Sequence, residues 1–316
     1  MKKFLGSLLI FSLLLTAALP SLAAAAPAGR LMVYAAIPTA QLDLMVDMFG
    51  DKYPRIIVDV LSAKEADVMA RVQAEAGAPQ GDVVLGGGLA AYQAVEGLLA
   101  SYATPNAKSF VEGYAAQAFT PIQLHVSAMI VNPALVKQAG VQIEGWASLK
   151  DERLSGQVVY MDPAASSPDA QQAAFVNSFA QSLDVAAPSA PSFVLNAVTM
   201  GQYAVGIISE EKAIERKLAG ADLEVVYAAE GVAMGASYAG ILAGTKNQEA
   251  AQLFMDFITS REYQQAAAEQ LHQRSIRTDV NFGLKEIAKT RDLVAANYDQ
   301  LTLTLIADAA VAGSSR

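Results

Sequence analysis

Short apolar runs alternate with amphipathic segments through the first third of the chain. The apolar runs, each predicted to be a buried strand, cover residues 31–35, 56–60 and 82–85. The first amphipathic segment places Leu42, Met45 and Phe49 on one helical face, and Thr39 is its expected N-cap. Buried strands that alternate with helices predict a parallel, doubly wound α/β sheet.

The alternation breaks in the middle of the chain. Residues 121–131 read as one strand, which is longer than a strand within a single lobe usually is, and it opens a second region. Further strands are expected at residues 156–161, 203–208 and 223–227, followed by an extended segment through Tyr238 and Leu242. A helix is expected at residues 247–260, and the remaining residues are predicted to be helical.

The first 26 residues have the layout of a secretory signal peptide. Lys2 and Lys3 form a basic head, residues 4–19 are an apolar run, and residues 23–26 offer small-residue cleavage sites. The run is shorter than the ~20 residues that cross a membrane, although a retained N-terminal anchor is the alternative. No Cys follows it, which excludes lipid attachment to an N-terminal Cys. We expect an exported, periplasmic protein.

The net charge indicates which macromolecules the chain does not bind, and the cysteine count indicates how it is stabilised. Removal of residues 1–26 leaves 20 basic and 31 acidic residues, a net charge of −11. Such a chain lacks the clustered Lys and Arg that bind nucleic acid or anionic membranes. Because there is no Cys, stability in an oxidising compartment has to come from core burial. About 290 remaining residues suffice for two lobes.

Motifs for catalysis or cofactor binding are absent from the sequence. There is no G-x-S-x-G, no H-E-x-x-H and no Walker-type phosphate loop. Residues 86–91 fit a relaxed dinucleotide pattern, but they follow the third strand and lack the later acidic residue. His125 and His272 are far apart and give no zinc spacing; we read His125 as a hinge or core residue. We expect no enzyme activity, no resident metal and no cofactor.

An ordered set of short motifs resembles the ABC-transporter extracellular solute-binding proteins, in the branch that holds ferric-ion, 2-aminoethylphosphonate and sugar-phosphate binders. The matching stretches, in the order of the family, are residues 33–35, 71–75, 80–83, 129–132, 146–149, 154–158, 161–163, 201–207, 230–231, 239–242 and 254–260. The resemblance implies a two-lobed periplasmic-binding-protein-like fold of type II, with crossing hinge strands and a ligand between the lobes. On this basis residues 27–125 and 232–316 are expected to form lobe 1, with the C-terminal helices packed on either lobe, and residues 126–231 to form lobe 2.

The sequence departs from this family where ferric-ion binders carry a Tyr-Tyr pair. After the strand at 203–208 this chain has Ser209, Glu210 and Glu211 instead, and it has no Tyr-Tyr anywhere. Iron coordination by paired tyrosinates is therefore not expected. The stretch between Asp162 and Gly201 is also shorter than usual in the family.

Loops at the carboxyl ends of the strands are the expected ligand site, because open α/β sheets bind ligands beyond these ends. From lobe 1 we expect contributions from Ala36, Ile37, Ser62, Ala63, Glu65, Gly87 and Gly88. Ser166 and Ser167 precede a helix of lobe 2, so their hydroxyls and the helix N-terminus could bind an anion opposite Ser62. Simple N-capping by each Ser is the alternative.

Acidic and aromatic residues complete the candidate set. Glu65, Glu210 and Glu230 would bind an amine, sugar hydroxyls or a metal if they face the cleft, and Glu211 could exchange roles with Glu210. Solvated surface acids are the alternative for all three. Ser209 lies at the position of the missing Tyr pair, and Tyr238 could flank the ligand.

The function indicated is an exported receptor that captures a small anionic or zwitterionic organic solute, of phosphonate or sugar-phosphate type, by hinge closure. Its partners are the solute and the membrane permease of an ABC transporter, and we expect a monomer. Three alternatives stay open: a ferric or other metal-ion receptor without the Tyr pair, a secreted hydrolase on a two-lobed fold, and a ligand-sensing partner of a signalling receptor.

Overall fold

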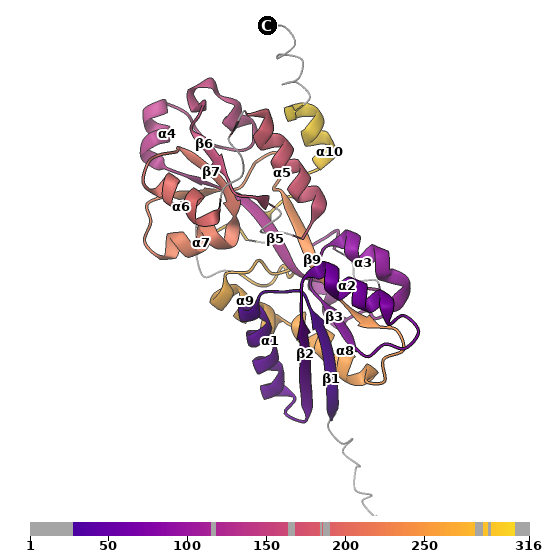
Figure 1. Cartoon of the computed structure of the whole chain (residues 1–316). Coiled ribbons are helices and arrows are strands. Elements are labelled where there is room, and N and C mark those ends of the chain that lie inside the picture. Colours follow the sequence, from indigo (N-terminus) through magenta and orange to yellow (C-terminus); the bar gives the residue numbers. More distant parts are fainter. Residues whose placement is uncertain are drawn as a thin grey trace, which may run out of the picture.

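Two lobes organise the chain (Figure 1). Hydrogen-bonded strands run from one lobe into the other, and apolar residues are buried on both faces of the sheet in each lobe. The structure is a computed structural model, and it describes residues 28–114, 118–163, 168–183, 185, 190–281, 287–289 and 292–306. The predicted signal peptide and the predicted anion-binding residues Ser166 and Ser167 lie outside these ranges.

Lobe 1 is built on a mixed sheet in which the strand order is β2-β1-β3-β9. Its strands are β1 (Gly29–Ala35), β2 (Ile56–Ser62), β3 (Val83–Leu85), β9 (Met234–Leu242) and the short β4 (Leu99–Ala100). Strands β1, β2 and β3 are parallel, as predicted, and β9 joins them antiparallel to β3. A strand that returns from the other lobe has to enter the sheet in the opposite direction.

Helices cover both faces of this sheet. One face is packed by α1 (Thr39–Lys52), α8 (Gln248–Ile258) and α9 (Arg261–Leu271), and the other by α2 (Glu65–Ala74) and α3 (Leu89–Val95). Two short 3₁₀ segments follow, η1 (Glu96–Leu98) and η2 (Pro105–Ser109). Thr39 is the first residue of α1 and not its cap; Pro38 occupies the N-cap position, and no side chain bonds the helix start.

Lobe 2 is a smaller sheet made of β6 (Val158–Tyr160), β7 (Val205–Ser209), β8 (Glu224–Val226) and the second half of β5. Its helices are α4 (Pro133–Ala139), α5 (Ala170–Ser182), α6 (Pro191–Thr199) and α7 (Glu210–Leu218), with 3₁₀ turns η3 (Ala147–Lys150) and η4 (Glu152–Leu154). The last described segments, α10 (Tyr298–Leu301) and the π-helical turn η7 (Thr302–Ile306), pack against α5 of this lobe. Between Leu271 and Tyr298 the described residues contain no α-helix, so the prediction of a wholly helical C-terminal part was wrong.

One long strand, β5 (Thr120–Val131), connects the lobes, and the predicted strand at 121–131 is thereby confirmed. Its first half pairs with β9 from Thr120↔Ala239 to Val126↔Met234, and its second half pairs with β7 and β8. Strands β5 and β9, which we call the crossing ribbon, run diagonally between the lobes (Figure 1).

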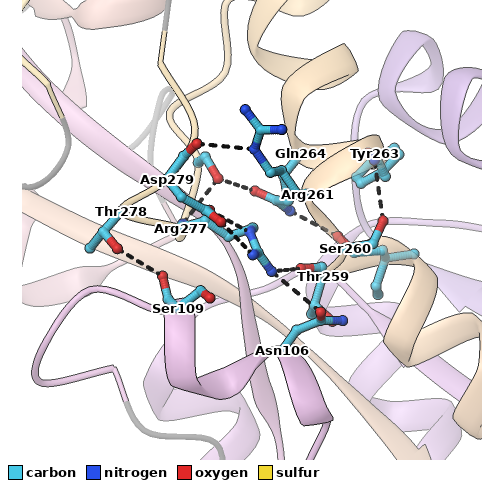
Figure 2. A network of polar contacts seen from close by, with 12 residues as sticks. Asn106, Ser109, Thr259, Ser260, Arg261, Tyr263, Gln264, Arg277, Thr278 and Asp279 are labelled. Atoms are coloured by element: carbon cyan, nitrogen blue, oxygen red, sulfur yellow. Dashed lines mark hydrogen bonds and ion pairs between the residues drawn. The ribbon is translucent and has the colours of Figure 1, made fainter.

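The segment that follows α9 is attached to lobe 1 by a polar network (Figure 2). The guanidinium of Arg277 bonds Asp279 with two contacts of 2.8 Å and reaches Thr259 O at 3.1 Å. Asn106 Nδ2 donates to Thr259 Oγ1 at 3.1 Å, and Thr278 Oγ1 donates to Ser109 O at 3.2 Å. These bonds hold a strand-free segment beside the crossing ribbon.

A buried ion pair joins this segment to lobe 2. Arg274 donates through Nε to Glu210 Oε2 at 2.9 Å and through Nη2 to Glu210 Oε1, and both side chains are 1% exposed. Tyr227 also donates its hydroxyl to Glu210, and Arg274 Nη1 donates to Ala288 O at 2.7 Å. Because the backbone of Arg274 bonds Leu124 of β5, the pair ties the start of α7 to the crossing ribbon.

We predict that Arg274→Met destabilises the fold by about 3–5 kcal/mol, because the variant leaves the carboxylate of Glu210 buried without its counter-ion. Urea denaturation measures the change. The double variant Arg274→Met/Glu210→Gln should recover roughly half of the loss or more, since the uncompensated charge is then absent. Equal stability of the single and double variants would contradict this account.

Candidate binding cleft

A cavity of about 420 Å³ lies where the two lobes meet the crossing ribbon. Its lobe 1 wall is formed by Ala36, Ile37, Pro38, Gln41, Glu65 and Gly87. Its lobe 2 wall is formed by Met161, Pro168, Pro191, Ser209, Glu211 and Lys212. We call this cavity the central cleft; its size is that of a small-molecule site.

The crossing ribbon forms the back of the central cleft. Gln123 and His125 of β5 and Ser237 of β9 line it, together with Gln273. Successive side chains on a strand face opposite sides, so Gln123 and His125 share a face. Our interpretation of His125 as a hinge or core residue recognised its strand but missed that it faces the cleft. The polar residues at alternate positions in an apolar strand were the available signal.

A chain of three side chains runs across the cleft from lobe 1 to lobe 2. Gln41 Nε2 donates to Gln123 Oε1 at 3.1 Å, and Gln123 Nε2 donates to Glu211 Oε1 at 2.6 Å. Because Gln123 Nε2 donates to Glu211, the amide of Gln123 presents its Oε1 to lobe 1, where it accepts from Gln41 Nε2. The Oε1 atom of Gln41 is therefore left as an acceptor.

Among the described residues, two buried polar atoms of the cleft lining have no hydrogen-bond partner, Gln41 Oε1 and Ser237 Oγ, and the side chain of Gln41 also interacts with the hydroxyl of Tyr263. Their residues are 2% and 3% exposed. Buried polar atoms are nearly always paired, and leaving one unpaired costs about 1–3 kcal/mol. The two atoms therefore mark places where a bound molecule would form bonds.

Charged groups in the cleft are two acids and one base among the described lining residues. Glu65 accepts a bond from the backbone N–H of Gly88 at 3.0 Å, which holds its carboxylate at the rim. Burial, and then the neighbouring charge of Glu210, raises the pKa of Glu211 to about 7. Lys212 pairs with the exposed Glu215 at 2.7 Å. In the part of the chain that the structure describes, no group of three or more His, Cys, Asp or Glu is placed to hold a metal ion.

Five of the predicted site residues line the central cleft: Ala36, Ile37, Glu65, Gly87 and Ser209. Ser62 is the last residue of β2 and Ala63 follows it; both lie next to Ala35, and neither is among the residues that line the cleft. Sequence reasoning missed Gln41, Gln123 and Ser237, and it named Glu211 only as a substitute for Glu210.

Glu210 and Glu230 do not line the central cleft. Glu210 is buried in its ion pair with Arg274, so the prediction that it faces a ligand is corrected: helix α7 turns Glu211 toward the cleft in its place. Glu230 accepts bonds from the backbone N–H groups of Trp146 at 3.2 Å and Ala147 at 2.8 Å. Its two oxygens thereby cap the turn at η3 in lobe 2.

Gly88 lies where the lobes touch beside the cleft. A Cβ atom at this position would overlap the carbonyl oxygen of Pro168 in lobe 2. The backbone of Gly88 has φ −88° and ψ 173°, which any residue adopts, so only this contact requires glycine. Gly88 permits the approach of the lobes.

Tyr238 lies on the opposite face of β9 from Ser237. It lines a separate cavity of about 530 Å³, together with Tyr114, Asp169 and Tyr298. We call this second space the aromatic cavity.

The chain is similar to known proteins in sequence and in fold. Residues 31–270 match the family described as bacterial extracellular solute-binding protein. An uncharacterised protein of Haemophilus influenzae is 27% identical over 317 residues, which cover 93% of this chain and 91% of that protein. No helix among the described residues is long and apolar enough to span a membrane.

Two solved structures share the fold. The periplasmic binding protein AfuA from Actinobacillus pleuropneumoniae, with fructose 6-phosphate bound, is 23% identical with a TM-score of 0.62 and covers 85% of this chain and 92% of its own. Iron-bound HitA from Pseudomonas aeruginosa is 17% identical with a TM-score of 0.66, covering 90% and 99%. At these identities the likeness establishes the two-lobed fold of type II, as predicted.

We predict that Glu211 makes stability fall as pH rises from 4.5 to 7. The folded protein keeps the proton of Glu211 up to a pKa of about 7, while the unfolded chain releases it near the ordinary value of 4.5. Stability from this group is thus complete below pH 4.5 and lost as pH passes 7. Glu211→Gln should remove this slope, worth on the order of 3 kcal/mol, in urea denaturation at several pH values.

The exposed Glu112→Gln serves as the control for this variant and should leave the pH profile unchanged. A profile of Glu211→Gln that parallels that of the wild type would show that Glu211 titrates normally.

Proposed function

The chain belongs to the bacterial extracellular solute-binding protein family, and we propose that it captures a small polar organic solute in the central cleft and delivers it to an ABC-transporter permease. The family implies a small-molecule ligand and a periplasmic location. An N-terminal signal peptide, a monomeric state and a lack of catalysis are parts of the same proposal.

The observation that carries the proposal is the pair of unpartnered buried atoms, Gln41 Oε1 and Ser237 Oγ. One belongs to lobe 1 and the other to the crossing ribbon, and both border the same cavity between the lobes. A ligand with hydroxyl or amine donors would pair with both atoms, which supports a solute in the cleft.

The charges of the cleft favour a zwitterion or a phosphorylated polyol over a simple anion. Glu65 and Glu211 attract hydrogen-bond donors or an amine, whereas Lys212 and Ser209 on the lobe 2 side suit an acidic group. Ser166 and Ser167 directly precede the cleft residue Pro168 in the sequence, and we propose that they contribute to binding the same acidic group. The sugar phosphate bound to AfuA has this combination of hydroxyls and phosphate.

Hinge closure is the proposed mechanism. A solute that touches the walls of both lobes binds the closed arrangement better than the open one and so shifts the population toward it. In the proposed closed arrangement, Gly88 of lobe 1 packs directly against the backbone of Pro168 of lobe 2.

Ligand identity can be tested by native mass spectrometry of freshly purified protein, followed by calorimetry with aminoalkylphosphonates, hexose phosphates, inorganic phosphate and ferric citrate. We expect an organic solute to bind, and Ser237→Ala to weaken it about 5- to 10-fold by removing one hydrogen bond. Ser178→Ala, in the aromatic cavity, is the matched control and should bind normally. Turnover of a panel member, or tight binding of iron alone, would refute the proposal.

We predict that Gly88→Ala weakens the same solute by at least about tenfold, because the added methyl group keeps the lobes apart. Small-angle scattering should show that the ligand no longer reduces the radius of gyration of this variant. Gly97→Ala is the control, since a Cβ at Gly97 meets no atom within 4 Å. Unchanged affinity and normal compaction in Gly88→Ala would show that closure does not use this contact.

A further inference from the structure

The aromatic cavity lies on the face of the crossing ribbon opposite to the central cleft. Met234 and Tyr238 of β9 line it, whereas Ser237 lines the central cleft. Because successive side chains on a strand point to opposite faces, β9 contributes different residues to the two cavities. The aromatic cavity has a volume of about 530 Å³ and is bounded by Leu89 and Tyr114 of lobe 1 and by α5 and α10 of lobe 2.

Four aromatic rings line this cavity: Tyr114, Phe175, Tyr238 and Tyr298. The rings of Phe175 and Tyr298 are 5.4 Å apart and form one wall on lobe 2. Tyr238 is anchored against Phe119, with the ring centroids 5.3 Å apart and the planes perpendicular. These rings are fixed by packing, so their faces and edges are already in place for a ligand.

The described lining of the cavity is acidic. Asp169 and Asp299 line it, and none of its described lining residues is Lys, Arg or His. Asp169 accepts a bond from the N–H of Gln172 at 2.9 Å and so caps α5, which holds its carboxylate in position.

The field of Asp169 reaches three tyrosines. Burial raises the pKa of Tyr238 to about 12, with a further contribution from Asp169. Burial raises the pKa of Tyr114, with contributions from Tyr238 and Asp169, and it raises the pKa of Tyr298, with contributions from Asp169 and Tyr114. All three phenols therefore stay neutral and keep their protons at neutral pH.

Two of these phenols have unused hydrogen-bonding capacity. The hydroxyl of Tyr298 donates to Met234 O at 2.8 Å. Those of Tyr114 and Tyr238 make no hydrogen bond among the described residues, although Tyr238 is only 7% exposed. The Tyr238 side chain is nine-tenths buried and borders the cavity, so its hydroxyl is available to pair with a molecule bound there.

We infer that the aromatic cavity is a second binding site, specific for an organic ammonium ion. The carboxylate of Asp169 supplies the opposite charge, and the rings of Tyr114, Tyr238 and Tyr298 supply the π-faces that attract ammonium groups. The free phenol oxygens accept from an N–H or O–H of the ligand. An anion is disfavoured, because the described lining has two carboxylates and no base.

The test uses the full exported protein and two probes of equal shape, choline and its uncharged carbon isostere 3,3-dimethylbutan-1-ol. Calorimetry should detect choline binding that is at least about tenfold tighter than that of the isostere. Asp169→Asn removes the charge but keeps the oxygen that caps α5, so the fold is retained while choline affinity falls at least about tenfold.

Glu211→Gln removes an acid from the central cleft and serves as the matched control, in which choline should bind normally. Loss of choline binding in Glu211→Gln but not in Asp169→Asn would place the ammonium in the central cleft and overturn the inference. Equal affinity for choline and the isostere, or no binding of choline, would also overturn it. Neither result bears on the solute of the central cleft, which is measured separately.

Discussion

The antiparallel pairing of β5 with β9 is the constraint on which the rest of the molecule depends. Each strand belongs to the sheet of lobe 1 over part of its length, and β5 continues into the sheet of lobe 2. A shift of one residue in their register would exchange the faces of every side chain. Ser237 would then leave the central cleft and Tyr238 the aromatic cavity, so a single pairing defines both spaces.

A buried ion pair, Glu210 with Arg274, lies beside the crossing ribbon. Buried ion pairs such as Glu210 with Arg274 seldom add net stability over apolar residues, but separating the two groups leaves an uncompensated buried charge. Here it fixes where α7 begins relative to β5, and the next residue, Glu211, is consequently aimed into the central cleft. The bonds of Arg277 to Thr259 and Asp279 hold the same segment from the side of lobe 1.

Local pattern was sufficient for the strands of lobe 1, the long strand β5 and the loops at Ala36, Ile37 and Gly87, because each depends on nearby sequence. It could not reveal that β9 returns antiparallel, since pairing partners are distant in the chain. It also could not tell Glu210 from Glu211: the choice depends on Arg274, which lies 64 residues away. The polar face of β5, by contrast, was readable from Gln123 and His125, and it was missed because single polar residues in apolar strands are usually satisfied within the core.

The described ends of the chain belong to different lobes: β1 begins at Gly29 in lobe 1, whereas α10 packs on α5 in lobe 2. The sequence contains no Cys, so thiols introduced at the exposed Arg30 and Gln300 would be the only two in the protein. A donor and an acceptor fluorophore attached to these thiols would lie on separate lobes. Their energy transfer would turn the angle between the lobes into an optical signal, and the chain into a reagentless sensor for whatever solute it binds.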